Sequence, residues 1–243
     1  MRPVVMHLID SFRQGGSESQ ALSLYQEMKK SGRLDVKLAC LDRSGPLLMK
    51  LPPAERKVIP EFKLNNFYDV RMGLQLYRFV RLLRQLRVEV VHTHDFYTNI
   101  FGMLAAVIAD VPVRVASRRE GQKRGRVKRF VERLAYRAAS AVIANCERIR
   151  KDLVAEGIAA KKVVTVFNGV SVESFQRANT GPAAQTPHPG VVTIVANLRP
   201  VKDHATFLRA GRRVVERCRG TSFVIAGEGE LEGCLRQMAA ASG

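Results

Sequence analysis

Two basic side chains, Arg199 and Lys202, follow an apolar stretch and are placed to bind negative charge. Residues 191–196 are β-branched or apolar throughout, which is typical of a strand buried on both faces of a parallel sheet. Asp203 is placed to cap a helix over residues 205–215. Open α/β sheets bind ligands beyond the carboxyl ends of their strands. We therefore expect this loop to bind an anionic ligand, in particular a phosphate ester.

A pair of glycines near the amino terminus predicts a second place where the backbone meets a ligand. Gly15 and Gly16 follow a predicted strand over residues 3–9 and precede a predicted helix over residues 21–30. Glycines let a backbone approach a ligand closely, and the amino terminus of a helix favours negative charge. A tight turn without a ligand is the alternative interpretation of the same residues.

Two histidines, His92 and His94, lie where a predicted strand over residues 88–93 ends. Side chains at the carboxyl end of such a strand are in a position to contact a ligand. Because side chains alternate along a strand, we expect one ring to point into the core. We assign the core position to His92 and the ligand-facing position to His94, with a purely structural role as the alternative.

These residues require alternating strands and helices, which the pattern of apolar residues predicts along the chain. Further strands are predicted at residues 35–41, 58–59, 112–117, 141–145, 163–167 and 222–226, and further helices at 69–87, 100–109, 127–140, 147–156 and 231–240. Residues 173–190 are rich in Gly, Pro and polar residues and predict a linker. The predicted fold class is α/β, with a Rossmann-like parallel-sheet domain over 1–172 and a second domain beginning at 191.

The chain is strongly basic, with 40 Lys and Arg against 22 Asp and Glu and a net charge of +18. Residues 111–162 hold 15 basic and five acidic residues, and residues 70–87 hold five arginines and no acid. Such charge attracts nucleic acids, membranes or anionic substrates. Residues 121–129 lack the aromatic side chains that nucleic-acid-binding surfaces combine with cations. We therefore expect no nucleic-acid partner, and an anionic membrane surface as the partner of the basic regions.

Cysteine usage and hydropathy bear on the compartment. The four cysteines are far apart and form no Cys-x-x-Cys pair, so neither a zinc site nor a disulfide framework is predicted. No apolar run reaches the roughly 20 residues of a membrane span, and the amino terminus shows no signal-peptide pattern. We expect a cytoplasmic protein that is soluble or peripheral on the inner face of the cell membrane.

Several motifs together resemble those of the retaining glycosyltransferases of family four, which have the GT-B fold. The matching stretches are residues 15–18, 91–94, 141–150, 166–170, 197–202 and 226–230. Their order and spacing run along nearly the whole chain. The resemblance implies a first domain that binds the acceptor, a second that binds a nucleotide-sugar donor, and a reaction in the cleft between them.

The resemblance also implies roles for individual residues. Arg199 and Lys202 match the pair that holds the donor diphosphate, Gly15 and Gly16 match the loop that faces it, and His94 matches the histidine near the transferred sugar. Breaking a sugar–phosphate bond leaves negative charge on the diphosphate, which fixed cations and backbone N–H groups stabilise in the transition state.

Three further positions, Asn168, Gly169 and Glu230, match residues that contact the donor or the opposite domain. The sequence has no cluster of carboxylates to hold a metal ion, so we expect neither a metal nor another cofactor. Retention in this family is explained by attack on the face from which the nucleotide leaves. We therefore nominate no catalytic nucleophile.

One departure from the family pattern concerns the second domain. The family has a Glu-x7-Glu motif there, but no glutamate of this chain has another eight residues on. We therefore expect a C-terminally truncated chain, in which residues 191–243 are the incomplete start of the donor domain. The alternatives are an inactive fragment that acts at most as a binding domain, a nucleic-acid-binding protein, and a sugar-nucleotide epimerase of the same fold, which the Arg199-x-x-Lys202 pattern disfavours. The sugar, the nucleotide base and the acceptor stay open, with an envelope polysaccharide or lipid-linked glycan as the expected acceptor.

Overall fold

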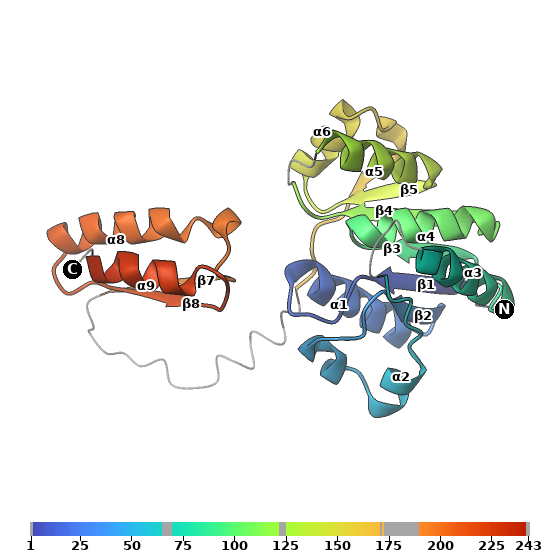
Figure 1. Ribbon diagram of the computed structural model, residues 1–243, viewed down its shortest axis with the longest axis horizontal. Helices are drawn as coiled ribbons and strands as arrows, with labels where there is room; N and C mark the ends of the chain where they lie inside the picture. Colours follow the sequence, from blue (N-terminus) through green and yellow to red (C-terminus); the bar gives the residue numbers. More distant parts are fainter. Residues whose placement is uncertain (1, 65–69, 122–124, 171, 173–189, 242–243) are drawn as a thin grey trace. The chain divides into compact units, whose positions relative to one another are not determined.

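The computed structural model of the chain describes residues 2–64, 70–121, 125–170, 172 and 190–241 (Figure 1). The chain divides into two compact units, residues 1–171 and residues 172–243. The predicted linker falls almost entirely on residues 173–189, which lie outside the described residues, as does Asp69 at the predicted start of a helix.

Unit 1 is built on a six-stranded sheet in which every described pairing is parallel, in the order β2-β1-β3-β4-β5-β6. The strands are β1 (Val4–Ile9), β2 (Asp35–Cys40), β3 (Val90–Thr93), β4 (Val113–Arg118), β5 (Ala141–Ala144) and β6 (Val163–Thr165). Val5 of β1 lies opposite Val36 on one side and Val90 on the other. The carboxyl ends of all six strands therefore meet at one edge, where an α/β sheet binds its ligands.

Helices cover both faces of this sheet (Figure 1). The longer ones are α1 (Gly16–Lys30), α3 (Val70–Gln85), α4 (Phe96–Ile108), α5 (Arg126–Ala138) and α6 (Glu147–Ala155); the short ones are α2 (Pro53–Val58) and the 3₁₀ turns η1 (Pro46–Lys50) and η2 (Ala160–Lys162). α1 and η1 pack on one face through Leu22, Tyr25 and Leu47. α3, α4, α5 and α6 pack on the other, where Phe79 and Phe101 stack. The two faces thus form two separate apolar layers.

The ends of several elements differ from the sequence-based predictions, and one predicted strand is wrong. Residues 58–59 do not form a strand, because Val58 is the last residue of α2. This helix begins at Pro53, and proline is favoured at the first position of a helix. The extended segment that follows makes only an isolated bridge between Glu61 and Cys40. α4 begins at Phe96 rather than at residue 100, because Thr98 accepts a hydrogen bond from the backbone N–H of Asp95 and so caps the first turn.

Unit 2 contains two parallel strands, β7 (Val191–Val195) and β8 (Ser222–Ala226), and the helices α8 (His204–Arg217) and α9 (Glu232–Ala241). A 3₁₀ turn, η3 (Pro200–Lys202), joins β7 to α8, and the predicted cap of α8 is confirmed: the Asp203 carboxylate accepts a hydrogen bond from the Thr206 N–H.

The prediction that the first strand of unit 2 is buried on both faces is wrong. Val191, Val192 and Val195 are exposed, and Val195 is 80% exposed. The reason is that the described part of unit 2 supplies only two strands and two helices, which is too little to cover both faces of a sheet. An apolar composition alone therefore does not establish that a strand is buried.

Candidate functional site

The glycine pair begins α1 at the carboxyl edge of the unit 1 sheet. Gly15 is the N-cap and Gly16 the first helical residue, so the helix begins five residues earlier than residue 21, where the sequence predicted it. A side chain at Gly15 would collide with the carboxylate of Glu18, whereas the space beside Gly16 is open. Gly15 lets the carboxylate of Glu18 lie against the backbone, and Gly16 leaves open space at the helix amino terminus at this edge.

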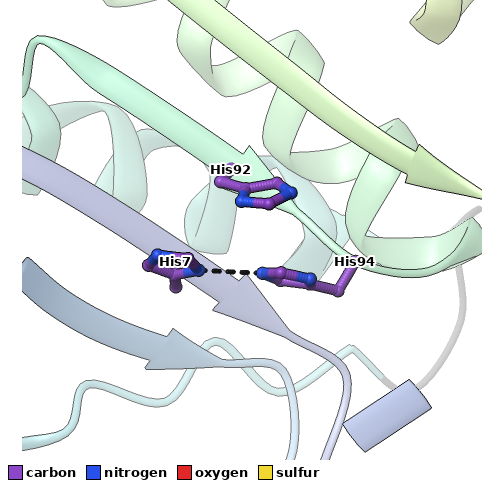
Figure 2. Close-up of side chains that lie close together, drawn as sticks. All are labelled: His7, His92 and His94. Atoms are coloured by element: carbon purple, nitrogen blue, oxygen red, sulfur yellow. Dashed lines mark hydrogen bonds between the residues drawn. The ribbon is translucent and has the colours of Figure 1, made fainter. Parts of the chain in front are cut away.

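Three buried histidines lie close together and form one layer (Figure 2). His7 of β1 pairs across the sheet with His92 of β3, and His94 follows two residues later. Nδ1 of His7 and Nε2 of His94 are 2.9 Å apart and share a hydrogen bond, and the two rings stack nearly parallel. Nε2 of His92 lies 2.8 Å from the hydroxyl of Ser117 on β4.

The prediction that strand alternation points His92 and His94 in different directions is wrong. Both rings lie on the same side of the sheet, with their centroids 4.1 Å apart, and neither is more than 6% exposed. The physical reason is the period of a strand: residues two apart point to the same face, so His92 and His94 cannot be separated by alternation. His7 belongs to the same layer, but the sequence did not predict it as a site residue. It lies within an apolar stretch that is typical of a buried strand.

Burial keeps this histidine layer uncharged. Burial is the largest cause that lowers the pKa of His7, to about 4, and the positive charge of Arg119 lowers it further. Burial also lowers the pKa of His92 and His94 well below the usual value, and the neighbouring histidines and Arg119 add to this effect. All three rings are therefore neutral near pH 7.

One ring nitrogen from each of the three histidines lies within 4.8 Å of the other two, close enough to raise the question of a metal ion. Three histidines are a known ligand set for zinc. Here, however, His7 and His94 are already hydrogen-bonded to each other and His92 to Ser117. A divalent cation at this place would also be buried near the positive charge of Arg119. None of its three ligands would be a carboxylate, so no negative charge among them would compensate for it. We interpret the cluster as a hydrogen-bonded layer that positions His94.

Outside the histidine layer, polar residues follow the ends of neighbouring strands. Arg119 donates from Nη1 to the side-chain oxygen of Asn168 at 3.2 Å, and its backbone oxygen accepts a hydrogen bond from Asn145 at 3.4 Å. Gln20 of α1 donates to the backbone oxygen of Gly169 at 2.8 Å. The structure therefore brings two predicted site residues, Asn168 and Gly169, to the edge that also carries the glycine loop.

The carboxyl group of Asp95 is the most perturbed acid at this edge. Burial is the largest cause that raises its pKa, to about 7, and the nearby negative charges of Glu18, Asp10 and Glu120 raise it further, while Arg119 opposes them. The environment thus combines acids with one guanidinium. Sequence reasoning missed Asp95 and Arg119, since only the order of the strands brings the ends of β3 and β4 together.

The remaining predicted residues belong to unit 2. Arg199 and Lys202 are exposed in the loop after β7, and the Lys202 N–H donates to the Arg199 oxygen at 3.0 Å. The loop that contains Glu230 is tied to this one, because the Leu198 N–H donates to the oxygen of Glu228 at 2.9 Å. Arg199, Lys202 and Glu230 therefore follow the carboxyl ends of two paired strands.

The fold and these loops define a class: α/β units with parallel sheets and polar residues at the carboxyl ends of their strands, as in the GT-B glycosyltransferases. Residues 14–174 match the family described as Glycosyltransferase Family 4, and the chain belongs to that family. The predicted resemblance and the predicted α/β, GT-B-like fold class are confirmed.

Two curated relatives show what proteins of this kind do. The chain is 28% identical to the UDP-Gal:alpha-D-GlcNAc-diphosphoundecaprenol alpha-1,3-galactosyltransferase of Escherichia coli, over 89% of this chain and 60% of the relative. It is also 28% identical to the putative glycosyltransferase EpsF of Bacillus subtilis, over 97% of this chain and 64% of the relative. The chain thus spans less than two thirds of the length of either one.

Solved structures agree on the fold. The crystal structure of Anabaena Alr3699/HepE in complex with UDP superimposes with a TM-score of 0.74 and 17% identity, over the whole of this chain and 66% of that one. A glycosyltransferase from Rickettsia africae superimposes with a TM-score of 0.75 and 14% identity, over 99% of this chain and 65% of that one. In the described residues, no helix is long and apolar enough to cross a membrane.

The histidine layer predicts acid sensitivity in unit 1. Between pH 6.5 and about 4 an unfolded His7 binds a proton that the folded His7 does not, so stability falls as the pH falls through this window. The shift corresponds to roughly 3 kcal/mol for His7. Urea unfolding of the wild type and of His7→Gln at pH 7 and pH 4.5 measures it: the free energy of unfolding should depend on pH less steeply in the variant. Asp95, whose raised pKa acts in the opposite direction, is common to both proteins. Equal pH dependence would mean that His7 is not the titrating group.

Proposed function

We propose that the chain is the acceptor-side unit and the beginning of the donor-side unit of a glycosyltransferase that moves a sugar from a nucleotide-sugar donor to an acceptor, with retention. The observation that carries the proposal is the family match over residues 14–174, combined with charged loops at the carboxyl ends of the strands. The name of the Escherichia coli relative supports a UDP-sugar donor, and HepE was crystallised with UDP-glucose.

The donor diphosphate would bind to the cations of unit 2. Arg199 and Lys202 are exposed, lie three residues apart in one turn and form no ion pair with another described residue, so both charges are available to oxygen atoms of a diphosphate. They would stabilise the negative charge that develops as the sugar–phosphate bond breaks. Because two cations supply this charge, we propose that neither a metal nor another cofactor is needed. Gly15 and Gly16, at the amino terminus of α1, are proposed as donor-binding residues, and Glu230 would contact the donor from the loop beside Arg199 and Lys202.

His94 would lie beside the transferred sugar, held in place by His7. Its ring is fully buried, and its Nδ1 atom has no hydrogen-bond partner among the described residues. If His7 donates to Nε2 of His94, Nδ1 of His94 carries a proton and lacks an acceptor. If His94 donates to His7 instead, Nδ1 of His94 has a lone pair and lacks a donor. A sugar hydroxyl can serve as either one. Asn168 and Gly169 would contact the donor from the loop that Arg119 and Gln20 hold by hydrogen bonds.

The acceptor would be a lipid-linked or envelope glycan reached from the cytoplasmic face of the cell membrane. The outer surfaces of α3, α4 and α5 carry exposed large apolar side chains: Leu74, Tyr77, Leu104, Val107, Ile108, Val127, Phe130 and Leu134. Arg81 and Arg84 lie among them, and together with Tyr77 and Ile108 they line a groove of about 550 Å³. Apolar side chains within a basic surface are the features of a protein that binds an anionic interface.

The test of the proposed reaction is a transfer assay. The enzyme is incubated with radiolabelled UDP-galactose, UDP-glucose or UDP-N-acetylglucosamine and with GlcNAc-diphosphoundecaprenol, the acceptor in the name of the Escherichia coli relative. A labelled lipid product whose new linkage is α by NMR supports transfer with retention. A β linkage would contradict retention, and binding of UDP without product from any donor would favour the alternative, a binding fragment without activity.

Membrane attachment is expected to be electrostatic. Each basic residue near an anionic surface contributes about 1 kcal/mol, so Arg81→Glu should lower the partition onto phosphatidylglycerol vesicles by about tenfold or more. Co-sedimentation in low and high salt measures this. The matched control is Lys50→Glu, an exposed charge on η1 that belongs to the opposite face of the sheet and should have little effect. Equal binding to neutral and anionic vesicles would exclude the electrostatic mechanism.

A further inference from the structure

We propose that Asp95, Arg119 and Asn145 form a subsite that binds the hydroxyl groups of a sugar ring. The three residues follow β3, β4 and β5, which are neighbours in the sheet, so their side chains meet at one edge. The proposal rests on the proposed function, because it specifies what the acceptor-side unit recognises.

Each of the three side chains has one buried polar atom without a hydrogen-bond partner among the described residues: Oδ2 of Asp95, Nε of Arg119 and Oδ1 of Asn145. One further nitrogen of two of them is engaged, since Arg119 Nη1 donates to Asn168 and Asn145 Nδ2 donates to the Arg119 oxygen. Buried polar groups are nearly always paired, and an unpaired one costs free energy. Three such atoms at one edge therefore indicate a ligand that supplies the missing partners.

The charges select the chemistry of that ligand. A phosphate would need donors, but two of the three atoms are acceptors, and the negative charges of Asp10, Glu18 and Glu120 act on Asp95. An ammonium group would be repelled by the positive charge of Arg119. The guanidinium and the Asp95 carboxylate attract each other electrostatically but form no ion pair in the described structure. Neighbouring hydroxyls suit the site, since each one donates and accepts: two O–H groups donate to the oxygens and one hydroxyl oxygen accepts from Nε–H.

Arg119→Lys is the decisive variant, because it keeps the positive charge and removes the Nε–H donor. In the transfer assay with a short-chain alkyl diphosphate of GlcNAc as acceptor, its KM for the acceptor should rise about tenfold while kcat and the KM for the donor stay close to wild type. Asn145→Ala should act in the same direction. Arg150→Lys, at a partly exposed arginine of α6 that is ion-paired with Glu147, is the matched control and should change nothing. Thermal melting establishes that each variant is folded.

Binding measurements separate this proposal from the proposed function. By calorimetry, methyl α-N-acetylglucosaminide should compete with the acceptor analogue for the wild type, and inorganic diphosphate should not compete at this subsite. A raised KM for the donor with an unchanged KM for the acceptor would assign the atoms to the donor sugar and overturn the proposal, as would unchanged constants in both folded variants. If no donor is transferred by the wild type, the proposed function fails, and loss of glycoside binding in Arg119→Lys still decides the subsite.

Discussion

Lys202→Ala is expected to lower turnover by about 100-fold and to weaken donor binding at the same time. The ammonium group is exposed in the loop after β7, where it can meet the departing diphosphate. Removing one preorganised group that stabilises developing charge costs on the order of 100-fold in kcat. Arg199→Ala should have a similar effect, because a guanidinium makes charge-assisted contacts with phosphate. Steady-state kinetics with a UDP-sugar, together with calorimetric titration of UDP, measures both quantities.

The control for this experiment is Arg209→Ala. Arg209 is also an exposed cation of unit 2, but it lies on α8, where it bonds to the hydroxyl of Thr206. Its removal changes the net charge by the same amount and should leave kcat and UDP affinity near wild type. Donor affinity and turnover that both stay near wild type in Lys202→Ala would remove the diphosphate role from this loop.

His94→Ala is expected to destabilise unit 1 by about 3 kcal/mol and also to lower turnover. The substitution leaves a cavity in a buried layer and takes away the hydrogen-bond partner of His7. His92→Ala should cost a similar amount, because its ring lies in the same layer and bonds to Ser117. Chemical denaturation measures both variants at pH 7, where the rings are neutral.

Leu104→Ala on α4 provides the comparison, since its side chain is 41% exposed and should cost less than about 1 kcal/mol. The turnover of folded His94→Ala, measured at a temperature well below its melting point, separates the role in the reaction from the role in stability. Full turnover in the folded protein would leave His94 with a structural role only.

The sequence predicted the positions of most strands, because strands buried on both faces are continuous apolar runs between turn residues. Its errors have physical causes. The strand predicted at residues 58–59 failed because two apolar residues are too few to distinguish a strand from the end of a helix that begins at Pro53. The burial predicted for β7 failed because burial depends on what covers a sheet, and the strand itself carries no information about that.

The candidate site was predictable to a smaller extent. Arg199 and Lys202 stand out because two cations follow an apolar strand. His7 does not, since its partner is set by the register between β1 and β3, which brings His7 opposite His92. In the same way, Asp95 and Arg119 become neighbours only through the strand order. Register and order depend on contacts between distant segments, so a local pattern cannot predict them.

The strand order of unit 1 also has a consequence during synthesis. After β1 and β2 have paired, β3, β4, β5 and β6 each join the same edge of the sheet in the order in which the ribosome delivers them. Domains of nascent chains fold as units from the amino terminus, so this sheet can grow by one strand at a time without waiting for unit 2. Apart from the outer edge of β2, the growing protein then offers a single unpaired edge to its surroundings, which limits pairing with other nascent chains.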